Sequence, residues 1–578
     1  RSIMNILGIC TEGPQSTGAC LLIDGKLIAM AEEERFVRIK QAPGLLPTRA
    51  SQYCLKAGGL KLRDIDAIAV SWDVAKYTDF MPRFYDDVER RYGDKGWLTY
   101  ISEKQILQRF QPDYVQHRIT ASLIKGADRG QMRPVRYVGH HKTHAAAAFW
   151  SSGFDEATIL TIDASGEEQC TVIWHGKGME ITQVESFDIP DSTGWMYAGL
   201  TEFLGFRPYS DEGSVMGLAC YGAYDPEIAA LFERIAPISP DGSYRIDPSY
   251  FFFGAHTYGD RYTDKLVHEL GLPFKYGDDI TPRQQNIAWA VQDRLEQIAV
   301  GLARRAVART GCRTLCLAGG VALNCKMNRV ILDSGAVDRL FIQPVSNDAG
   351  SALGAAQLVA AEMGDDPRFE QRLVHYGPDY SNAEIKAVLD GHKLRYEYLP
   401  NGRLERRAAA RIAQGGIVGW FQGRMEAGPR ALGSRSIIAS PIGAAVKDRI
   451  NEAVKYREPW RPFAPSIKAE RIGDFVLNPI EAPFMILTFD VRPEVADQIA
   501  AVVHVDNTVR PQTVRAEDLP RWYRVIDEFE KLTGVPMILN TSFNVKGEPI
   551  VNTPQDAVRT FYGSGLDGLA IGDFWLEK

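Results

Sequence analysis

An internal repeat is the feature that most constrains the fold of this 578-residue chain. Residues 5–36, NILGICTEGPQSTGACLLIDGKLIAMAEEERF, read as an apolar strand, a turn of small residues, a second strand, an Asp-Gly turn and a third strand. Residues 157–187, ATILTIDASGEEQCTVIWHGKGMEITQVESF, repeat that order. Two meanders of three strands, each followed by helical sequence, predict duplicated α/β lobes that face each other across a cleft.

Small-residue turns at the strand ends indicate where a nucleotide would lie in such a cleft. Gly166 ends the turn Ala164-Ser165-Gly166, whose backbone N–H groups can approach phosphates. In TLCLAGGVALNCKMNRVI, a strand, the Gly319-Gly320 turn and a helix follow one another, an order that points a helix N-terminus at an anion. Many strand–helix turns contain two glycines, so ordinary packing is the competing interpretation.

Three of the ten histidines lie within five positions, in VGHHKTHAAAAFW. If a helix starts near residue 139, His140 and His144 stand one turn apart on one face and can share a metal ion, whereas His141 points elsewhere. Asp348, in PVSNDAGSALGAA, would supply a third ligand, and imidazole plus carboxylate suits Fe(II), Mn or Zn. The alternatives are histidines that only hydrogen-bond in a packed helix and an Asp348 that caps one.

The length and composition describe a globular chain of two or three domains. The polar, turn-rich segment MGDDPRFEQRLVHYGPDYSNAEI sets a predicted boundary near residue 370, which gives domains 1–370 and 371–578. A net charge of −7 gives no general attraction to nucleic acid or acidic membranes. With no run of about 18 apolar residues, no signal-peptide pattern and eight cysteines without a CxxC pair, we expect a cytoplasmic protein with buried free thiols.

The second predicted domain is rich in basic residues beside glycine and proline between residues 424 and 461. Guanidinium groups bind phosphate oxygens in pairs, so this stretch favours a phosphate-binding pocket over a solvated helix face. The segment EPWRPFAPS is too proline-rich and aromatic for an exposed helix. The polar residues of LNTSFN can donate hydrogen bonds there or form a structural turn. The pocket residues expected from this reasoning are Arg424, Arg430, Arg435, Lys455, Arg457, Arg461, Asn540, Ser542 and Asn544.

These motifs together resemble the carbamoyltransferase family. HHKTHAAAAF, EGSVMGLACYG, LAGGVALNCKMN and PVSNDAGSALGAA are similar to its Kae1-like, actin-type (ASKHA) ATPase portion, and GWFQGRMEAGPRALGSRSI, DRINEAVKYREPWRPFAPS, HVDNTVRPQTV and LNTSFNVKGEPIV to its C-terminal YrdC-like domain. The resemblance spans nearly the whole chain in the family's order. It implies an α/β fold with a two-lobed transfer domain followed by a YrdC-like α/β domain that activates the carbamoyl group.

The resemblance implies a two-step reaction in natural-product tailoring, such as antibiotic biosynthesis. Carbamoyl phosphate and ATP, with Mg, would give carbamoyl-adenylate with release of pyrophosphate and phosphate, and the transfer domain would pass the carbamoyl group to a small-molecule hydroxyl and release AMP. The resemblance assigns a metal, with iron expected, to His140, His144 and Asp348. It places Gly319, Gly320 and Asn324 along the nucleotide.

The resemblance is incomplete on the acceptor side. Many members of the family have His-Asp in the first N-terminal turn, where this chain has Gln15-Ser16, and Ser214 replaces the Lys of EGKVMGLA. The base for transfer is therefore sought elsewhere, among Asp163, Glu167, Asp211 and His141. We expect His141, Asp163, Arg430 and Arg461 to be catalytic.

Two other functions fit parts of the sequence. One is a threonylcarbamoyl-type transferase that modifies tRNA, which the acidic chain disfavours. The other is a nucleotide-gated binding module without transfer chemistry. The sequence leaves the acceptor and the oligomeric state open, a homodimer included.

Overall fold

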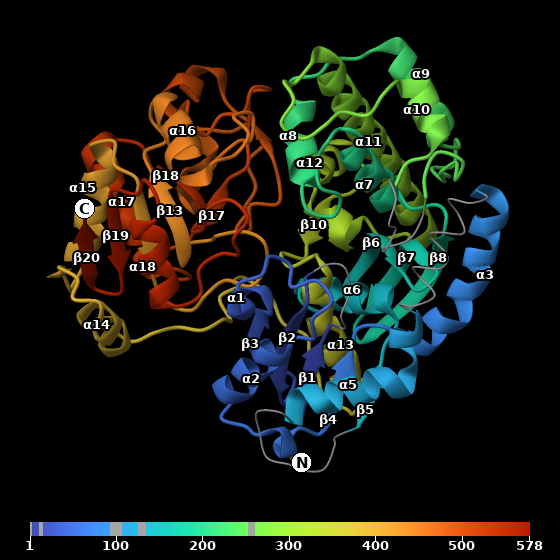
Figure 1. Cartoon of the computed structure of the whole chain (residues 1–578), viewed down its shortest axis with the longest axis horizontal. Coiled ribbons are helices and arrows are strands. Elements are labelled where there is room, and N and C mark those ends of the chain that lie inside the picture. The colour runs from blue at the N-terminus through green and yellow to red at the C-terminus, as the bar shows by residue number, and fades with distance from the viewer. Residues whose placement is uncertain (1–2, 11–15, 93–106, 125–133, 253–260) are drawn as a thin grey trace. The chain divides into compact units, whose positions relative to one another are not determined.

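A computed structural model describes residues 3–10, 16–92, 107–124, 134–252 and 261–578 (Figure 1). The chain divides into two compact units. Unit 1 comprises Arg1–Glu33 and Gln41–Gln371, and unit 2 comprises Glu34–Lys40 and Arg372–Lys578. Unit 2 therefore contains a short piece of chain from near the N-terminus, which no sequence pattern indicated.

Unit 1 contains two five-stranded sheets with the same topology. The first has the order β3-β2-β1-β4-β5 and the second the order β10-β9-β6-β7-β8. In each sheet three strands form an antiparallel meander, and the first strand of the meander pairs in parallel with the next strand along the chain. The strands are β1 (Asn5–Ile9), β2 (Gly18–Ile23), β3 (Lys26–Glu32), β4 (Ala67–Val70), β5 (Val135–Tyr137), β6 (Glu156–Gly166), β7 (Gln169–Lys177), β8 (Glu180–Asp188), β9 (Thr314–Ala318) and β10 (Arg339–Ile342). This duplication confirms the predicted two-lobed, actin-type α/β fold.

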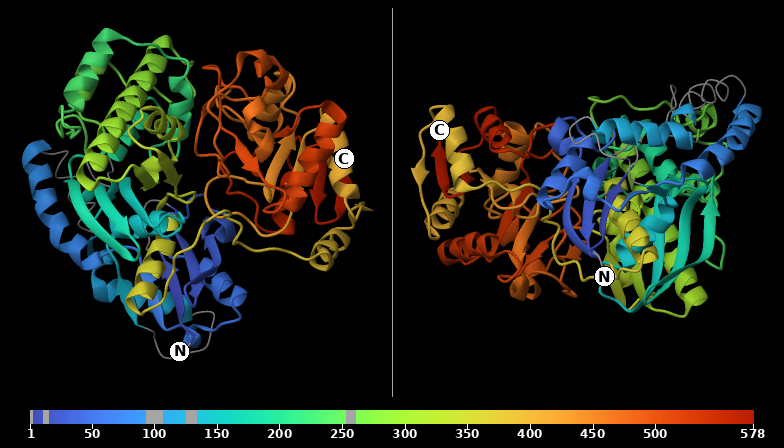
Figure 2. Two further views of the ribbon diagram at one scale, coloured as in Figure 1. Left: turned by 180° about the vertical axis from the view of Figure 1, so that it is seen from behind. Right: turned by 90° about the horizontal axis from the view of Figure 1, so that it is seen from below.

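The described helices of unit 1 flank these sheets (Figures 1 and 2). The longest, α11 (Pro282–Thr310), begins with a capping box in which Thr281 and Gln284 exchange side-chain to backbone hydrogen bonds, and ends at Gly311 in the left-handed conformation. The others are α2 (Thr48–Ala57), α3 (Val74–Tyr92), α5 (Pro112–Ile124), α6 (His140–Phe149), α7 (Thr193–Phe203), α8 (Glu212–Ala219), α9 (Pro226–Ile235), α10 (Asp264–Leu270), α12 (Cys325–Asp333) and α13 (Asp348–Glu362).

Helices α6 and α13 cross each other between the two sheets. Helix α6 packs on β6 and β9 of the second sheet, and α13 packs on β1, β2 and β4 of the first. The alanine run that follows the histidines, Ala145–Ala148, is fully buried, because only small side chains fit where α6 meets both the sheet and α13. Two helix N-termini are thereby brought to one place, beside the carboxyl ends of β1, β4, β6 and β9.

Unit 2 is built on a mixed eight-stranded sheet of order β11-β20-β19-β12-β13-β18-β14-β17, drawn mainly in orange and red in Figure 2. Its strands are β11 (Glu397–Tyr398), β12 (Val418–Phe421), β13 (Arg435–Ala439), β14 (Ala464–Lys468), β17 (Gln512–Val514), β18 (Met537–Ser542), β19 (Gly568–Ile571) and β20 (Phe574–Glu577), and β15 (Phe489–Asp490) pairs with β16 (Thr508–Val509). Its helices are α1 (Glu34–Val37), α14 (Asn382–Gly391), α15 (Arg403–Ala413), α16 (Ala445–Ile450), α17 (Pro520–Thr533) and α18 (Pro554–Tyr562).

The segment 34–40 is held in unit 2 by two arginines. Arg35, 1% exposed, donates to the carbonyl oxygens of Glu426 and Gly428 at 3.4 and 2.6 Å. Arg38 donates to the carbonyl oxygens of Pro549 and Ile550 at 2.9 and 2.7 Å. These bonds satisfy loop carbonyls of unit 2 that burial would otherwise leave without donors.

All eight cysteines are free, six of them buried, while Cys220 and Cys312 are partly exposed. Among the described helices, none combines the length and the apolar character that crossing a membrane requires.

Candidate functional site

Four side chains converge where α6 and α13 begin. His140 and His144 come from α6, Asp163 from β6 and Asp348 from the first position of α13, and one donor atom of each lies within 4.8 Å of the others. His140 Nε2 lies 3.1 Å from Asp163 Oδ2 and 3.5 Å from Asp348 Oδ1. His144 Nε2 lies 3.2 and 3.9 Å from the same two oxygens. The structure thus brings together the three predicted metal ligands and adds Asp163, which the sequence suggested only as a catalytic group.

The spacing of these atoms fits a metal ion. The two histidine Nε2 atoms are 3.1 Å apart, within the range of the other donor distances. In a tetrahedral site with ligands about 2.0–2.1 Å from the ion, neighbouring donors are about 3.3 Å apart. Two imidazoles and two carboxylates are a donor set that Fe(II), Mn and Zn accept.

A hydrogen bond outside the cluster orients His140. Its Nδ1 lies 3.1 Å from the carbonyl oxygen of Ser71, just after β4, so Nδ1 carries a proton and Nε2 is left to face the carboxylates. The Ser71 hydroxyl in turn accepts from Ser351 at 2.7 Å, one turn along α13 from Asp348. The Trp72 ring packs on the imidazole with the ring centroids 4.6 Å apart. These contacts come from the end of β4 in the first sheet and from α13.

The charges at the cluster are strongly coupled. Burial lowers the pKa of His140, but hydrogen bonds to Asp163 and Asp348 outweigh it and hold the pKa well above its ordinary value. Burial raises the pKa of Asp163, but hydrogen bonds with His140 and His144 outweigh it, so that this pKa is lowered. Two imidazoles facing two carboxylates therefore need a cation between them, either a proton or a metal ion.

The glycines predicted for the nucleotide are explained here by close packing. Gly319 has φ +94°, and a Cβ there would lie 2.2 Å from the Ile162 carbonyl oxygen. A Cβ at Gly320 would lie 3.2 Å from Asp163 Oδ1, and one at Gly166 would lie 2.6 Å from His140 Cδ2. The backbones of these glycines consequently lie beside the cluster of His140, His144, Asp163 and Asp348. Their role in nucleotide binding stays a prediction.

Asn324 caps α12. Its side-chain oxygen accepts from the backbone N–H of Met327 at 2.9 Å, and its Nδ2 donates to Gln292 at 2.8 Å. Both ends of this amide are therefore engaged within the protein, and its predicted contact with the nucleotide remains to be tested.

His141 lies in a different environment from its neighbour. Its ring is fully buried, with Nδ1 2.8 Å from Thr161 Oγ1 and Nε2 3.1 Å from the carbonyl oxygen of Gln169. Burial lowers the pKa of His141 to about 3, so the ring is neutral at physiological pH. Because both nitrogens are occupied, this position favours packing over the catalytic role expected from the sequence.

The structure describes some of the other residues that the sequence associated with the acceptor. Gln15 lies outside the described residues, and Ser16 is buried at 8% exposure. Asp211 accepts from the backbone N–H of Arg207 at 3.1 Å at the start of α8. Ser214, in place of the family's Lys, is buried in the same helix.

In unit 2, Lys455 forms the centre of a buried polar cluster. It ends a π-helical turn, Asn451–Lys455, and is 5% exposed. Its Nζ donates to Ser542 Oγ at 3.1 Å and to Asn544 Oδ1 at 2.8 Å, and also to the carbonyl oxygens of both residues. The structure therefore joins three predicted pocket residues that are almost ninety positions apart.

Further positive charges gather around Lys455. Burial lowers the pKa of Lys455 well below its ordinary value, and the charges of Arg457, Lys40 and Arg461 lower it further. Burial likewise lowers the pKa of Arg457, with Arg461, Arg510 and Arg430 adding to the effect. Such mutual repulsion between cations is relieved by an anion, so this cluster has the electrostatics of a phosphate site. Lys40 and Arg510 were not identified from the sequence, since Lys40 lies more than 400 positions before Lys455.

Three predicted pocket residues have structural partners instead. Arg435 is fully buried, donates to the carbonyl oxygens of Gln422 and Pro378 at 3.0 Å, and lies over the Phe421 ring at 3.7 Å. Arg424 donates to the carbonyl oxygen of Tyr376 at 2.7 Å. Asn540 donates to the carbonyl oxygen of Ala431 at 2.9 Å. These environments favour loop-holding roles, which the density of arginines in the sequence does not distinguish from phosphate binding.

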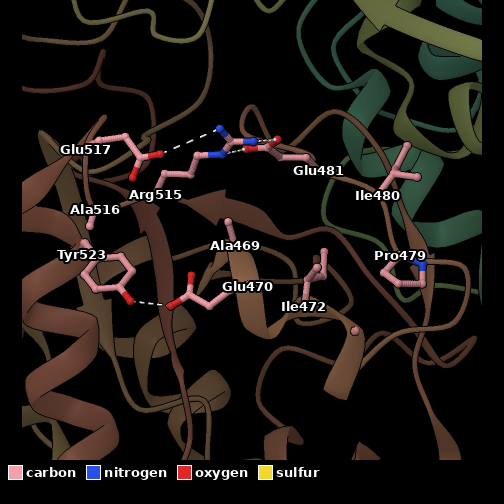
Figure 3. A pocket seen from close by; sticks show the side chains of 11 residues that line it. Ala469, Glu470, Ile472, Pro479, Ile480, Glu481, Arg515, Ala516, Glu517 and Tyr523 are labelled. Atoms are coloured by element: carbon pink, nitrogen blue, oxygen red, sulfur yellow. Dashed lines mark hydrogen bonds and ion pairs between the residues drawn. The ribbon is translucent and has the colours of Figure 1, made fainter.

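A separate surface pocket of about 580 Å³ also lies in unit 2 (Figure 3). Its charged groups already pair with one another: Arg515 pairs with Glu481 and lies 3.8 Å from Glu517, and the Tyr523 hydroxyl donates to Glu470. None of its lining residues is a predicted site residue. We therefore assign it no chemistry.

The fold and the two sites together define the class of enzyme. Its two-lobed α/β unit carries a histidine–carboxylate cluster, and its second unit carries a cluster of cationic side chains around Lys455. Family comparison identifies it more closely. Residues 5–357 match the model "Carbamoyltransferase N-terminus" and residues 409–578 match "Carbamoyltransferase C-terminus". The chain belongs to the carbamoyltransferase family.

Relatives agree with this assignment. The chain is 38% identical to the nodulation protein NolNO of Sinorhizobium fredii, over 97% of this chain and 79% of that protein. It is 34% identical to an uncharacterized protein of Synechocystis, over 99% and 97% of the two chains. It is 28% identical to the 3'-hydroxymethylcephem-O-carbamoyltransferase of Amycolatopsis lactamdurans, over 76% and 80%.

Solved structures resemble unit 1 only distantly. Component A of (R)-2-hydroxyglutaryl-CoA dehydratase from Acidaminococcus fermentans covers 62% of this chain and 98% of its own, with a TM-score of 0.30 and 14% identity. HypF of T. kodakarensis covers 62% of this chain and 48% of its own, with a TM-score of 0.30 and 12% identity. The fold assignment accordingly rests on the strand topology of the two sheets.

Proposed function

We propose that this carbamoyltransferase is an ATP-dependent O-carbamoyltransferase that forms carbamoyl-adenylate in unit 2 and transfers the carbamoyl group to a small-molecule hydroxyl in unit 1. The observation that carries the first half is the group of cations around Lys455. ATP and carbamoyl phosphate bring several negative charges to one place, and Lys455, Arg457 and Arg461 with Lys40 supply matching positive charge.

In the activation step, water first hydrolyses carbamoyl phosphate to carbamate and phosphate. The carbamate oxygen then forms a bond to the α-phosphorus of ATP, and the bond to the pyrophosphate oxygen breaks. Arginine and lysine side chains directed at these oxygens stabilise charge as it develops on the leaving pyrophosphate. Arg461 lies 3.8 Å from Glu458 and its side chain is 35% exposed, so it can reach a bound substrate, which supports its expected catalytic role.

In the transfer step, the acceptor oxygen attacks the carbamoyl carbon, the bond from that carbon to the phosphate oxygen of AMP breaks, and the hydroxyl proton passes to water. His140, His144, Asp163 and Asp348 would hold a divalent metal, with iron expected, beside the backbone of Gly319 and Gly320. When bound, such an ion supplies positive charge for a nucleotide phosphate and lowers the pKa of a bound hydroxyl. The chain's own part is to fix the imidazole orientation, through Ser71, and to exclude water by burying three of the four ligands.

The acceptor class follows from the relatives. A related enzyme is named for O-carbamoylation of a hydroxymethyl cephem, which is a small-molecule alcohol. The acidic net charge of this chain fits such an acceptor better than tRNA.

The test uses purified protein with ATP and isotope-labelled carbamoyl phosphate, and no acceptor. We expect pyrophosphate release and a carbamoyl-adenylate peak by mass spectrometry. Arg461→Met should reduce pyrophosphate release at least tenfold, whereas Arg449→Met should leave it unchanged, because Arg449 lies in the same basic stretch but pairs with Asp567. If pyrophosphate instead requires bicarbonate and threonine, the tRNA-type function replaces this one, and if no combination releases it, the chain is a binding module.

A further inference from the structure

The two-residue turn between β6 and β7 contacts the cluster formed by His140, His144, Asp163 and Asp348. Gly166 and Gln169 pair across β6 and β7, so Glu167 and Glu168 form the turn between these strands. Glu167 adopts φ +51°, a left-handed conformation that is uncommon for any residue but glycine and persists only where the surroundings enforce it. Its conformation directs the side chain inward, since Glu167 is only 2% exposed.

The Glu167 carboxylate accepts backbone N–H groups from two separate segments. Oε1 accepts from Asp73 at 2.7 Å and from His140 at 3.2 Å, and Oε2 accepts from His140 at 3.2 Å. The first donor lies just beyond Ser71, whose carbonyl oxygen holds His140 Nδ1, and the second is the backbone of His140 itself. One carboxylate therefore fixes both the residue that bears the imidazole and the loop that orients it.

We propose that Glu167 is a positioning residue for the metal ligand His140, and this proposal rests on the metal site proposed above. Ligand geometry must be held within about 0.5 Å for tight binding, and partners one shell away from a metal typically change its affinity about 10–100-fold. A role as general base does not fit, because both carboxylate oxygens face backbone N–H donors in a buried position.

The test is a titration of the metal-free full-length protein with Co²⁺, followed by its visible absorption and by competition with a chelator. Glu167→Gln should bind Co²⁺ about 10–100-fold more weakly and shift the absorption bands, because the amide NH₂ faces a backbone donor where a carboxylate oxygen accepted one. Glu168→Gln is the matched control at the same hairpin. Glu168 pairs with Lys76 at the surface, so this variant should match the wild type.

Each outcome has a distinct meaning. A folded Glu167→Gln with wild-type affinity and spectrum overturns the positioning role, even if its melting temperature is lower, because the residue would then only stabilise the fold. If Glu167→Gln does not fold, Glu167→Asp, which keeps the charge but shortens the reach, must show the same weaker binding, and wild-type binding by that variant overturns the proposal. Failure of the wild type to bind Co²⁺, Fe²⁺, Mn²⁺ or Zn²⁺ overturns the metal site itself.

Discussion

Gly354→Ala tests whether the crossing of α6 and α13 sets both the fold and the metal cluster. A Cβ at Gly354 would lie 1.7 Å from the Thr143 carbonyl oxygen, half of the 3.4 Å at which ordinary contact begins. The obstacle is backbone, so no side chain can rotate away and the two helices must separate.

The size of the effect follows from two opposing contributions. Added volume in a close-packed core costs about 1–3 kcal/mol, and a rigid backbone obstacle belongs at the upper end. Replacing a helical glycine by alanine returns about 1 kcal/mol of helix propensity. We therefore expect unit 1 to lose about 1–2 kcal/mol. Because α13 also carries Asp348, 3.5 Å from His140 Nε2, separation of the helices should weaken metal binding about tenfold as well.

The assay is hydrogen–deuterium exchange of the metal-free protein under native conditions, which reports unit 1 separately from unit 2. Amides of α6 and α13 should exchange faster in Gly354→Ala. Gly213→Ala is the control, because Gly213 also lies in a helix of unit 1 but has no atom within 4 Å of its added Cβ. That variant should be neutral or more stable. A Gly354→Ala protein at least as protected as the wild type would refute the reasoning that this crossing excludes a Cβ.

Three further predictions follow from the sites. His144→Ala should abolish carbamoyl transfer to an acceptor yet retain pyrophosphate release, and loss of pyrophosphate release first would contradict the assignment of the two steps to two units. A bound anion should raise the lowered pKa of Lys455 towards its ordinary 10.5. Across a series of pH values below 10.5, ATP binding should therefore take up protons where free Lys455 has lost its own, seen as a calorimetric enthalpy that varies with the buffer's ionisation enthalpy; Lys455→Met should show no such uptake, and its absence from the wild type at every pH would contradict this prediction. Burial raises the pKa of Glu212 from 4.5 to about 7, so the folded state holds this proton longer than the unfolded state and stability falls as pH rises between those values. Glu212→Gln should therefore melt higher than the wild type above pH 7 and not below pH 4.5, and parallel melting curves at all pH values would contradict it.

The sequence predicted the lobes of unit 1 well because both meanders repeat one local pattern. Each strand pair is close in sequence, and the turns at Asp24-Gly25 and at 164–168 are marked by small or polar residues. A run of small residues in a helix, such as the alanines after the histidines, is typical of a close helix crossing, although no crossing was predicted from it. What no local pattern shows is which helix is crossed, and the crossing partner lies 200 positions away in α13.

The cluster of His140, His144, Asp163 and Asp348 could be predicted from the sequence only in part. His140 and His144 follow from helical spacing, and Asp348 from a motif with a polar residue before a small-residue helix. Asp163 was identified as functional but not as a ligand, because its position is set by the parallel pairing of β6 with β9, which places its carboxylate beside the histidines. The signal that could have found it is the carboxylate that directly follows a buried strand, since ligands gather at the carboxyl ends of parallel strands.

For the arginines of unit 2, the sequence does not show which of them contact the protein itself and which could contact a substrate. Composition marks the whole stretch as cationic, but a guanidinium that holds loop carbonyls and one that faces a substrate have the same sequence appearance. Their charged neighbours separate them: Glu426 and Asp379 lie near Arg435, whereas burial and then neighbouring cations lower the pKa of Lys455 and Arg457. An anion would offset the repulsion in the second environment, and for this reason we propose the phosphate site at Lys455.

The same reasoning explains why Lys40 matters although it lies far from this stretch in sequence. Arg35 and Arg38 hold segment 34–40 in unit 2 by donating to its loop carbonyls, and the segment ends with Lys40 among the pocket cations. Residues 41 onward return to unit 1. The chain from 372 to 578 therefore lacks part of its own pocket and two donors to its loops. The boundary between the two folded units therefore cannot be placed at a single position in the sequence.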